Sequence, residues 1–170
     1  MRKGKLVKQS YFDPEPGAPG PLSVRTTRRV RFEELDPLRI VWHGRYVSYF
    51  EDGRVAFGRE YGLSYEAFME HRLAAPIVKL HLDYLTPLTF DELITIEATL
   101  HWCAALRLNF EFTVFNGAGK KAASGYSVQV LTDLRGNIFF VAPDWIEEFR
   151  RKWLAGNLSG KDPDMKPGAQ

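Results

Sequence analysis

An aspartate and a histidine stand close together just ahead of a predicted helix. The stretch from Asp36 to Tyr46 reads DPLRIVWHGRY, and from Arg45 onward apolar residues recur at helical spacing. The N-terminus of a helix leaves main-chain N–H groups without acceptors and carries a partial positive charge. A carboxylate brought near that end faces a site that stabilises a developing oxyanion. The pattern predicts a nucleophile or base at Asp36 and a main-chain donor at His43.

Thioester cleavage suits this small set of groups. A thiolate leaves readily, so the reaction requires no strong general acid. It requires a nucleophile, or a base for water, and a donor where the carbonyl oxygen gathers charge. Asp36 supplies the first and the His43 N–H the second, while the His43 imidazole orients Asp36 or the acyl group. The competing interpretation is a turn or capping role for Asp36 beside Pro37, and a merely half-exposed side chain at His43.

The elements that position these residues begin with a long helix. Apolar side chains from Tyr46 to Tyr61 recur on one helical face, and Gly62 is expected to end the helix. Gly53 lies on the same face, although a glycine inside a helix costs about 1 kcal/mol relative to alanine. This position therefore predicts a close approach of the helix to a sheet.

Alternating apolar and polar residues predict strands in the second half of the chain. The short, turn-rich connections between them contain no helices, which implies antiparallel neighbours. The predicted strands are 24–32, 78–84, 94–100, 106–114 and 127–132, and shorter helices are predicted after Ser64 and after Pro143. The fold class is therefore α+β, with a long helix laid on one face of an antiparallel sheet.

Length and composition indicate one soluble domain. We expect a flexible Pro/Gly-rich arm at 1–22, either mobile or laid down as a strap, a single domain at 23–155 and a flexible tail at 156–170. The net charge of +2 gives no reason to expect nucleic acid as a partner. No apolar run is long enough to span a membrane. The single cysteine, Cys103, excludes an internal disulfide and fits a reducing compartment, so a cytoplasmic location is expected.

The run LDPLRIVWHGRYVSYFEDGRVAF resembles the signature of the 4-hydroxybenzoyl-CoA thioesterase family, and most closely its branch of Tol–Pal-cluster acyl-CoA thioesterases. Two later stretches, DYLTPLTFDEL and AASG, are also similar to segments of that family. The resemblance covers residues 24 to 153, nearly the whole predicted domain. The positions that match the main signature are Asp36, Val41, Trp42, His43, Tyr46, Glu51 and Arg54.

The resemblance implies a hotdog fold, in which a curved antiparallel sheet wraps a long central helix. It also implies a homodimer or homotetramer that hydrolyses a small or medium acyl-CoA, or an acyl-carrier-protein thioester, at a subunit interface. In the family the aspartate matching Asp36 is the nucleophile or base, and the N–H matching His43 polarises the thioester carbonyl. The motif thus favours catalysis at Asp36 over a turn role.

The chain departs from the family pattern beside the aspartate. Arg39 stands where the family usually has glycine, and Leu35 where threonine is common. Arg39 either forms an ion pair with Asp36 or binds an acidic group of the substrate. We assign Arg39, together with Trp42 and Tyr46, to substrate binding, although Tyr46 also has the pattern of a core residue.

Two other functions remain open. In one, the chain is a non-catalytic hotdog acyl-binding subunit whose pocket Arg39 fills. In the other it is a hotdog dehydratase acting on hydroxyacyl thioesters, but the His and acid motif for that chemistry is absent from the sequence. Asp52 follows His43 by nine positions and imitates the acid of phenylacetyl-CoA-type thioesterases. It ranks behind Asp36, because a solvated helix face explains it equally well.

The remaining charged residues and histidines suggest supporting roles. No metal and no cofactor are expected, because His71, His81 and His101 lack partners at metal-ligand spacing. Glu51 and Arg54, three positions apart, predict an ion pair on the helix. Basic residues in two turns are either solvated or contact the phosphates of coenzyme A, and these are Lys120, Lys121 and Arg135.

Overall fold

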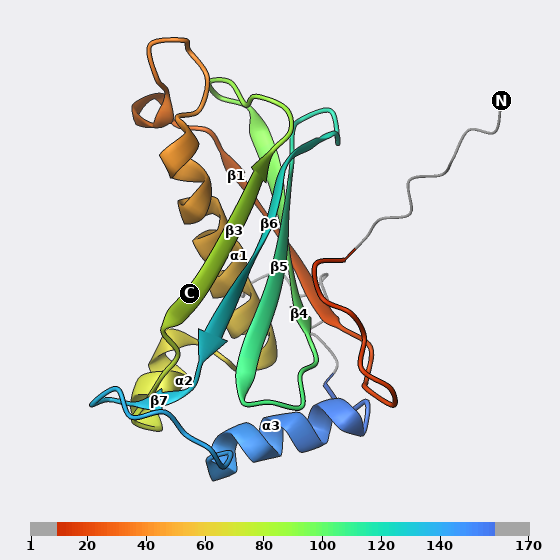
Figure 1. Cartoon of the computed structure of the whole chain (residues 1–170). Coiled ribbons are helices and arrows are strands. Elements are labelled where there is room, and N and C mark those ends of the chain that lie inside the picture. The colour runs from red at the N-terminus through yellow and green to blue at the C-terminus, as the bar shows by residue number, and fades with distance from the viewer. Residues whose placement is uncertain (1–9, 159–170) are drawn as a thin grey trace, which may run out of the picture.

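A five-stranded antiparallel sheet forms the centre of the protein, in the order β1-β4-β5-β6-β3. The computed structural model describes residues 10–158, and Figure 1 shows the long helix α1 beside the sheet. In chain order the elements are β1 (Leu22–Arg29), η1 (Phe32–Glu34), η2 (His43–Arg45), α1 (Tyr46–Tyr61), α2 (Tyr65–Glu70), β2 (Leu73–Ala74), β3 (Ile77–Tyr84), β4 (Leu93–His101), β5 (Arg107–Phe115), β6 (Lys121–Val130), β7 (Thr132–Asp133) and α3 (Asp144–Leu154). This α+β arrangement confirms the predicted hotdog fold. Within residues 10–158 no helix is long and apolar enough to cross a membrane.

The predicted alternation appears as burial on one face of the sheet. In β4, every second side chain from Ile94 to Leu100 is buried, and the residues between are only half-buried. The buried face packs against α1, which places Phe50 parallel to Phe112 with ring centroids 4.6 Å apart. Apolar burial of this kind supplies most of the stabilisation of a helix on a sheet.

Helix α1 approaches the sheet most closely at Gly53. A Cβ atom at this position would lie 3.0 Å from Cγ2 of Ile96 and 3.2 Å from Cβ of Ala98. The glycine is therefore required by packing, as predicted. The helix ends at Gly62, whose φ of 79° gives the left-handed cap that glycine adopts without strain.

Two predicted strand boundaries are wrong. Strand β1 ends at Arg29 because Val30 bonds to the connection before β4, accepting from Asp91 N–H and donating to Glu92, so Phe32 lies in η1. Strand β6 begins at Lys121, earlier than the predicted start, because its small residues gave no alternating signal.

Gly125, one of those small residues, is required by close packing. A Cβ atom on Gly125 would lie 2.1 Å from the carbonyl oxygen of His81 and 2.8 Å from the Phe50 ring. The predicted last strand also divides, since β6 ends at Val130 and Thr132 belongs to β7. β7 pairs with β2 in a small second sheet that the sequence pattern did not indicate.

The two shorter helices form where they were predicted. Ser64 caps α2, and its hydroxyl accepts the N–H of Ala67 at 3.2 Å. Helix α3 buries Ile146, Phe149 and Trp153. In Figure 1 it lies across one end of the sheet, opposite the loop that carries η1 and η2.

Residues 10–21 lie along the sheet and contact it. The hydroxyl of Tyr11 donates to Asp83 at 2.6 Å and lies 2.9 Å from the Ser124 hydroxyl, and the Ser10 hydroxyl donates to Glu111 at 2.7 Å. The predicted boundaries of the arm, domain and tail stay predictions. Residues 1–9 and 159–170, where most of the tail and part of the arm were placed, lie outside the described residues.

Candidate active site

Asp36 opens a tight turn that precedes the long helix. Its N–H donates to the carbonyl of Ile40 at 2.9 Å, and its own carbonyl accepts the N–H of Arg39 at 2.9 Å. The side-chain Oδ1 accepts the N–H of Leu38 at 2.8 Å. One carboxylate oxygen thus fixes the turn, while hydrogen bonding within the described residues leaves Oδ2 without a partner. The half-buried carboxylate therefore has a fixed orientation and one oxygen available for chemistry.

Arg39 occupies the position in this turn where the backbone is left-handed. Its φ is 62°, a region that costs a residue with a side chain about 1–2 kcal/mol. This conformation explains why glycine suits the position. The Arg39 side chain is exposed, and no ion pair joins it to Asp36 in the described part of the chain. Of the two alternatives for Arg39, contact with an acidic substrate group stays a prediction.

His43 is the first residue of the helical segment η2. Its N–H has no acceptor among residues 10–158, while the N–H of Trp42 donates to Glu34 and that of Arg45 donates to Trp42. The His43 imidazole is exposed and packs beside the Trp42 ring, with centroids 4.9 Å apart. An unpaired N–H at the positive end of a helix is a suitable donor for an oxyanion.

Two tyrosines hold the helix start to the rest of the fold. The Tyr84 hydroxyl donates to the His43 carbonyl at 2.8 Å, and its ring packs edge-on against Tyr46, with centroids 5.2 Å apart. Tyr46 is only 3% exposed, and burial raises the pKa of its hydroxyl despite a bond to the Leu88 main chain. Tyr46 is thus a core residue in this chain, and its predicted contact with substrate stays a prediction, as does that of the half-exposed Trp42.

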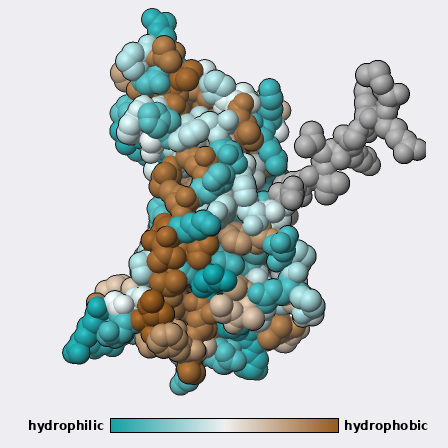
Figure 2. All heavy atoms as spheres, in the orientation of Figure 1, coloured by the Kyte–Doolittle hydropathy of each residue, from teal (hydrophilic) through white to brown (hydrophobic). Residues whose placement is uncertain are grey.

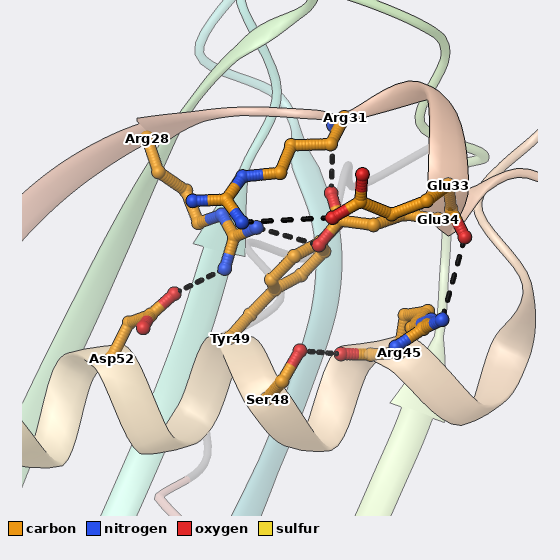
Figure 3. Close-up of polar contacts among 8 residues, drawn as sticks. All are labelled: Arg28, Arg31, Glu33, Glu34, Arg45, Ser48, Tyr49 and Asp52. Carbon is orange, nitrogen blue, oxygen red and sulfur yellow. Dashed lines mark hydrogen bonds and ion pairs between the residues drawn. The ribbon is translucent and has the colours of Figure 1, made fainter.

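A charged cluster lies beside the loop, made of Arg28, Glu34, Tyr49 and Asp52 (Figure 3). Arg28 donates to Asp52 and to Glu34, both at 2.6 Å. Burial alone would lower the pKa of Arg28, but the two carboxylates outweigh it and the pKa is raised. Burial, then the neighbouring Glu34, raises the pKa of Tyr49. The solvated helix face expected at Asp52 is only partly correct, because its half-exposed carboxylate is held by Arg28.

A cavity of about 600 Å³ lies beyond the middle of α1. Its walls are mainly apolar and include Leu63, Phe68, Leu73, Leu108 and Phe110, and Ala75 and Pro76 line it just before β3 begins. Helices rise ~1.5 Å per residue, so Arg54 on its wall is roughly 16 Å along the axis from His43. Asp36 lines neither this cavity nor the two smaller ones described with it.

The other candidate residues take several positions. Glu51 and Arg54 form the predicted ion pair on α1, and burial lowers the pKa of Arg54. In Figure 1 the turn that precedes β6, which holds Lys120, lies at the same end as the Asp36 loop, and the loop after β7, which holds Arg135, lies at the opposite end. No group of three or more histidine, cysteine or carboxylate side chains within residues 10–158 is arranged to hold a metal ion.

Sequence reasoning missed two residues that shape the loop, Glu34 and Tyr84. Glu34 carried one usable signal, a glutamate three positions after Arg31, and its carboxylate does accept the Arg31 N–H at 2.8 Å. Tyr84 was predicted as an apolar strand residue in a stretch similar to the family, but its hydrogen bond depends on how β3 and α1 pack.

Comparisons with known proteins identify the family of this chain. The profile of the thioesterase-like superfamily matches residues 30–154. YneP of Bacillus subtilis (strain 168), a candidate acyl-CoA thioesterase, is 24% identical over 61% of this chain and 75% of its own length. The acyl-CoA thioester hydrolase YbgC of Escherichia coli O6:H1 is 27% identical over 52% of this chain and 66% of its own length, just under two thirds.

A solved structure has the same fold. The DHNA-CoA thioesterase from Staphylococcus aureus superposes with a TM-score of 0.70 at 21% identity, covering 79% of this chain and 93% of that chain. The matched profile spans the Asp36 turn, helix α1 and the sheet strands β3 to β6. The chain therefore belongs to the thioesterase-like superfamily.

Proposed function

We propose that the protein is a thioester hydrolase that cleaves small or medium acyl-CoA thioesters at the Asp36 turn. The observation that supports this most strongly is the fixed Asp36 carboxylate one short loop ahead of the unpaired His43 N–H. The names of YneP and YbgC support the same reaction. Acyl carrier protein is the second thiol carrier to be tested, and the cytoplasm is the proposed location.

The reaction proceeds by attack on the thioester carbonyl carbon. The Asp36 carboxylate either attacks this carbon itself or takes a proton from an attacking water. The carbonyl oxygen gathers negative charge and accepts a hydrogen bond from the His43 N–H. The C–S bond then breaks, and the thiolate leaves and takes up a proton. When Asp36 attacks directly, the acyl group is left on its carboxylate as a mixed anhydride, which a water then hydrolyses; when Asp36 acts as the base, the attacking water gives the acid at once. On either route the products are the free acid and the thiol of coenzyme A, and the Asp36 carboxylate is regenerated.

The proposal includes a homodimer formed through β3. This strand is one edge of the sheet and pairs only with β6 in the described chain. Its side chains Val78, Leu80 and Tyr84 are 59%, 41% and 52% exposed. Figure 2 shows a band of apolar side chains over the region where β3 and α1 lie in Figure 1. An exposed apolar edge strand is a template for pairing with a second copy.

Such a dimer places the cavity of one subunit beside the loop of the other. Two identical strands paired antiparallel about a two-fold axis set the start of one against the end of its partner. The cavity lies at the Ile77 end of β3, and the Tyr84 end is bonded to His43. The 600 Å³ cavity therefore receives the acyl group whose thioester lies at the partner's loop. This arrangement accounts for the position of Asp36, which lines none of the three cavities described above. A homotetramer is a further association of such dimers.

The non-catalytic acyl-binding subunit is the alternative, motivated by the exposed Arg39 beside Asp36. A thiol-release screen across short, long and aromatic acyl-CoA substrates separates the two. Multiple turnovers with at least one substrate are expected for the hydrolase. A stable acyl-CoA complex with no thiol released over hours would establish the binding subunit instead. The same screen repeated with acyl carrier protein thioesters identifies the thiol carrier.

A further inference from the structure

We propose that Glu34 is a positioning residue that sets the place of the Asp36 carboxylate and the His43 N–H. This inference rests on the proposed thioesterase function and adds to it a residue that does not touch the substrate. Glu34 acts through both of its acceptor groups, the side-chain carboxylate and the main-chain carbonyl. Together they hold the two legs of the loop that runs from η1 to α1: the first leg leads into the Asp36 turn, and the second leads out of it to His43.

The carboxylate of Glu34 joins three separate elements. Its side chain is 5% exposed, and Oε1 accepts from the Arg28 guanidinium of β1 at 2.6 Å. Its Oε2 accepts the Arg31 N–H at 2.8 Å and the Tyr49 hydroxyl of α1 at 3.1 Å. Figure 3 shows the carboxylate between the chain that leaves β1 and the helix below it. The first leg of the loop is therefore tied to both the sheet edge and the helix.

The carbonyl of Glu34 holds the second leg. It accepts the N–H of Trp42 at 2.8 Å, one residue before His43, and the next pair inward, Leu35 and Val41, forms an isolated antiparallel bridge. The Asp36 turn is thus the closed end of a loop whose two legs meet at Glu34. A shift of this residue moves the carboxylate and the oxyanion donor together.

The charge on Glu34 gives this junction its rigidity. Asp52 also binds Arg28 at 2.6 Å, and the guanidinium lies 4.9 Å from the centre of the Tyr49 ring, so it is fixed from three sides. Charge-assisted hydrogen bonds are shorter and more directional than neutral ones. Buried ion pairs add little net stability to a fold, and in Glu34→Gln the Arg28 guanidinium keeps only Asp52 as a charged partner. The cluster therefore contributes to the position of the loop and little to the net stability of the fold.

The test compares Glu34→Gln with Glu111→Gln in the full-length protein. Glu111 is a matched control because its carboxylate, also only 13% exposed, pairs with His101 at 3.1 Å on the opposite face of the sheet. A misplacement of ~1 Å costs about 10²-fold in rate, so Glu34→Gln is expected to lower kcat by about 10- to 100-fold. The KM for acyl-CoA is expected to stay within about twofold, and Glu111→Gln to leave kcat unchanged.

A second readout does not depend on activity. Hydrogen exchange of the Trp42 amide is expected to quicken at least about tenfold in Glu34→Gln, because local opening controls exchange, and to stay unchanged in Glu111→Gln. An unchanged kcat in folded Glu34→Gln, or an unchanged Trp42 exchange rate, overturns the proposal. If Glu34→Gln does not fold, Tyr49→Phe and Arg28→Lys take its place, and wild-type values of kcat and exchange in both overturn it.

The two proposals fail in different ways. A wild-type protein that releases no thiol from any acyl thioester refutes the proposed function, and the exchange rate of Trp42 still decides whether Glu34 holds the loop. If the wild-type protein is active and Glu34→Gln leaves kcat and the Trp42 exchange rate unchanged, the positioning role alone is refuted.

Discussion

The Tyr84 hydroxyl donates a hydrogen bond of 2.8 Å to the main-chain carbonyl of His43. Tyr84 is the last residue of β3, and His43 is the first residue of η2. This bond therefore connects the exposed edge of the sheet to the proposed oxyanion donor. This hydrogen bond therefore couples the proposed subunit contact to the proposed catalytic loop.

The variant Tyr84→Phe tests this connection. A single hydrogen bond contributes about 1 kcal/mol, so its loss from the loop is expected to lower kcat about fivefold. Tyr61→Phe is the matched control, since its hydroxyl donates to the Ser23 carbonyl at 3.1 Å near the far end of α1. Steady-state thiol release measures both variants. Equal kcat values for the two would show that the Tyr84 bond does not serve the loop.

The left-handed backbone at Arg39 predicts different stabilities for two substitutions at this position. Arg39→Gly and Arg39→Ala remove the same charge, but only glycine adopts a φ of 62° without steric cost. The glycine variant is expected to be about 1 kcal/mol more stable to unfolding than the alanine variant. Urea denaturation of both measures the difference. A more stable alanine variant would contradict the turn geometry described for Asp36.

The same pair of variants tests substrate recognition by Arg39. If Arg39 binds an acidic group of the substrate, both variants raise the KM for acyl-CoA substrates whose acyl group carries a free carboxylate. The KM for unsubstituted acyl-CoA is then unchanged. Equal effects on the two substrate classes would remove Arg39 from the binding site.

The proposed dimer predicts that a charge on the β3 edge abolishes both association and activity. Leu80→Asp places two like charges across the two-fold axis, where the wild-type strand presents an apolar side chain. We expect a monomer by light scattering and at least about tenfold lower kcat/KM, because the Asp36 loop no longer lies beside the cavity of a partner subunit. Lys79→Ala, on the opposite face of β3, is the control. A fully active monomeric variant would exclude the composite site.

Acid should weaken the contact between Ser10 and the sheet through Glu111. Burial alone would raise the pKa of Glu111, but the nearby His101 ring and the Ser10 hydroxyl outweigh burial and lower it. A carboxyl whose folded pKa is depressed stabilises the fold above its ordinary pKa of 4.5, and this stability is lost as the pH falls through the folded value. The stability difference between wild type and Glu111→Gln should therefore be largest near neutral pH and vanish in acid. Thermal melts between pH 7 and pH 3 measure it, and a difference that grows in acid would contradict the shift.

The sequence predicted the elements whose signals are local. The alternation from Ile94 to Leu100, the cap at Ser64 and the mid-helix Gly53 each reflect one strand, one helix end or one point of close packing, and each was confirmed. Strand β6 was placed too late because it begins with small residues, which have no strand signal of their own, and the small size of Gly125 is required by the packing of Phe50.

The site was less predictable, because its parts meet only after folding. Arg28 and Asp52 lie on different elements and come together when α1 packs across β1, so no spacing in the sequence revealed the Glu34 cluster. The cavity proposed to hold the acyl group likewise forms between helices and strands that are distant in the chain. The roles of Asp36, His43 and Trp42 stay predictions.

The variant Asp36→Asn tests the central claim most directly. The asparagine Oδ1 can still accept the Leu38 N–H, so the turn is kept while the negative charge is removed. Asp52→Asn is the control for a general effect of losing a carboxylate. With the best acyl-CoA substrate, Asp36→Asn is expected to lower kcat by at least about 10³-fold, and Asp52→Asn by no more than about tenfold. Wild-type turnover by a folded Asp36→Asn protein would contradict the proposed mechanism.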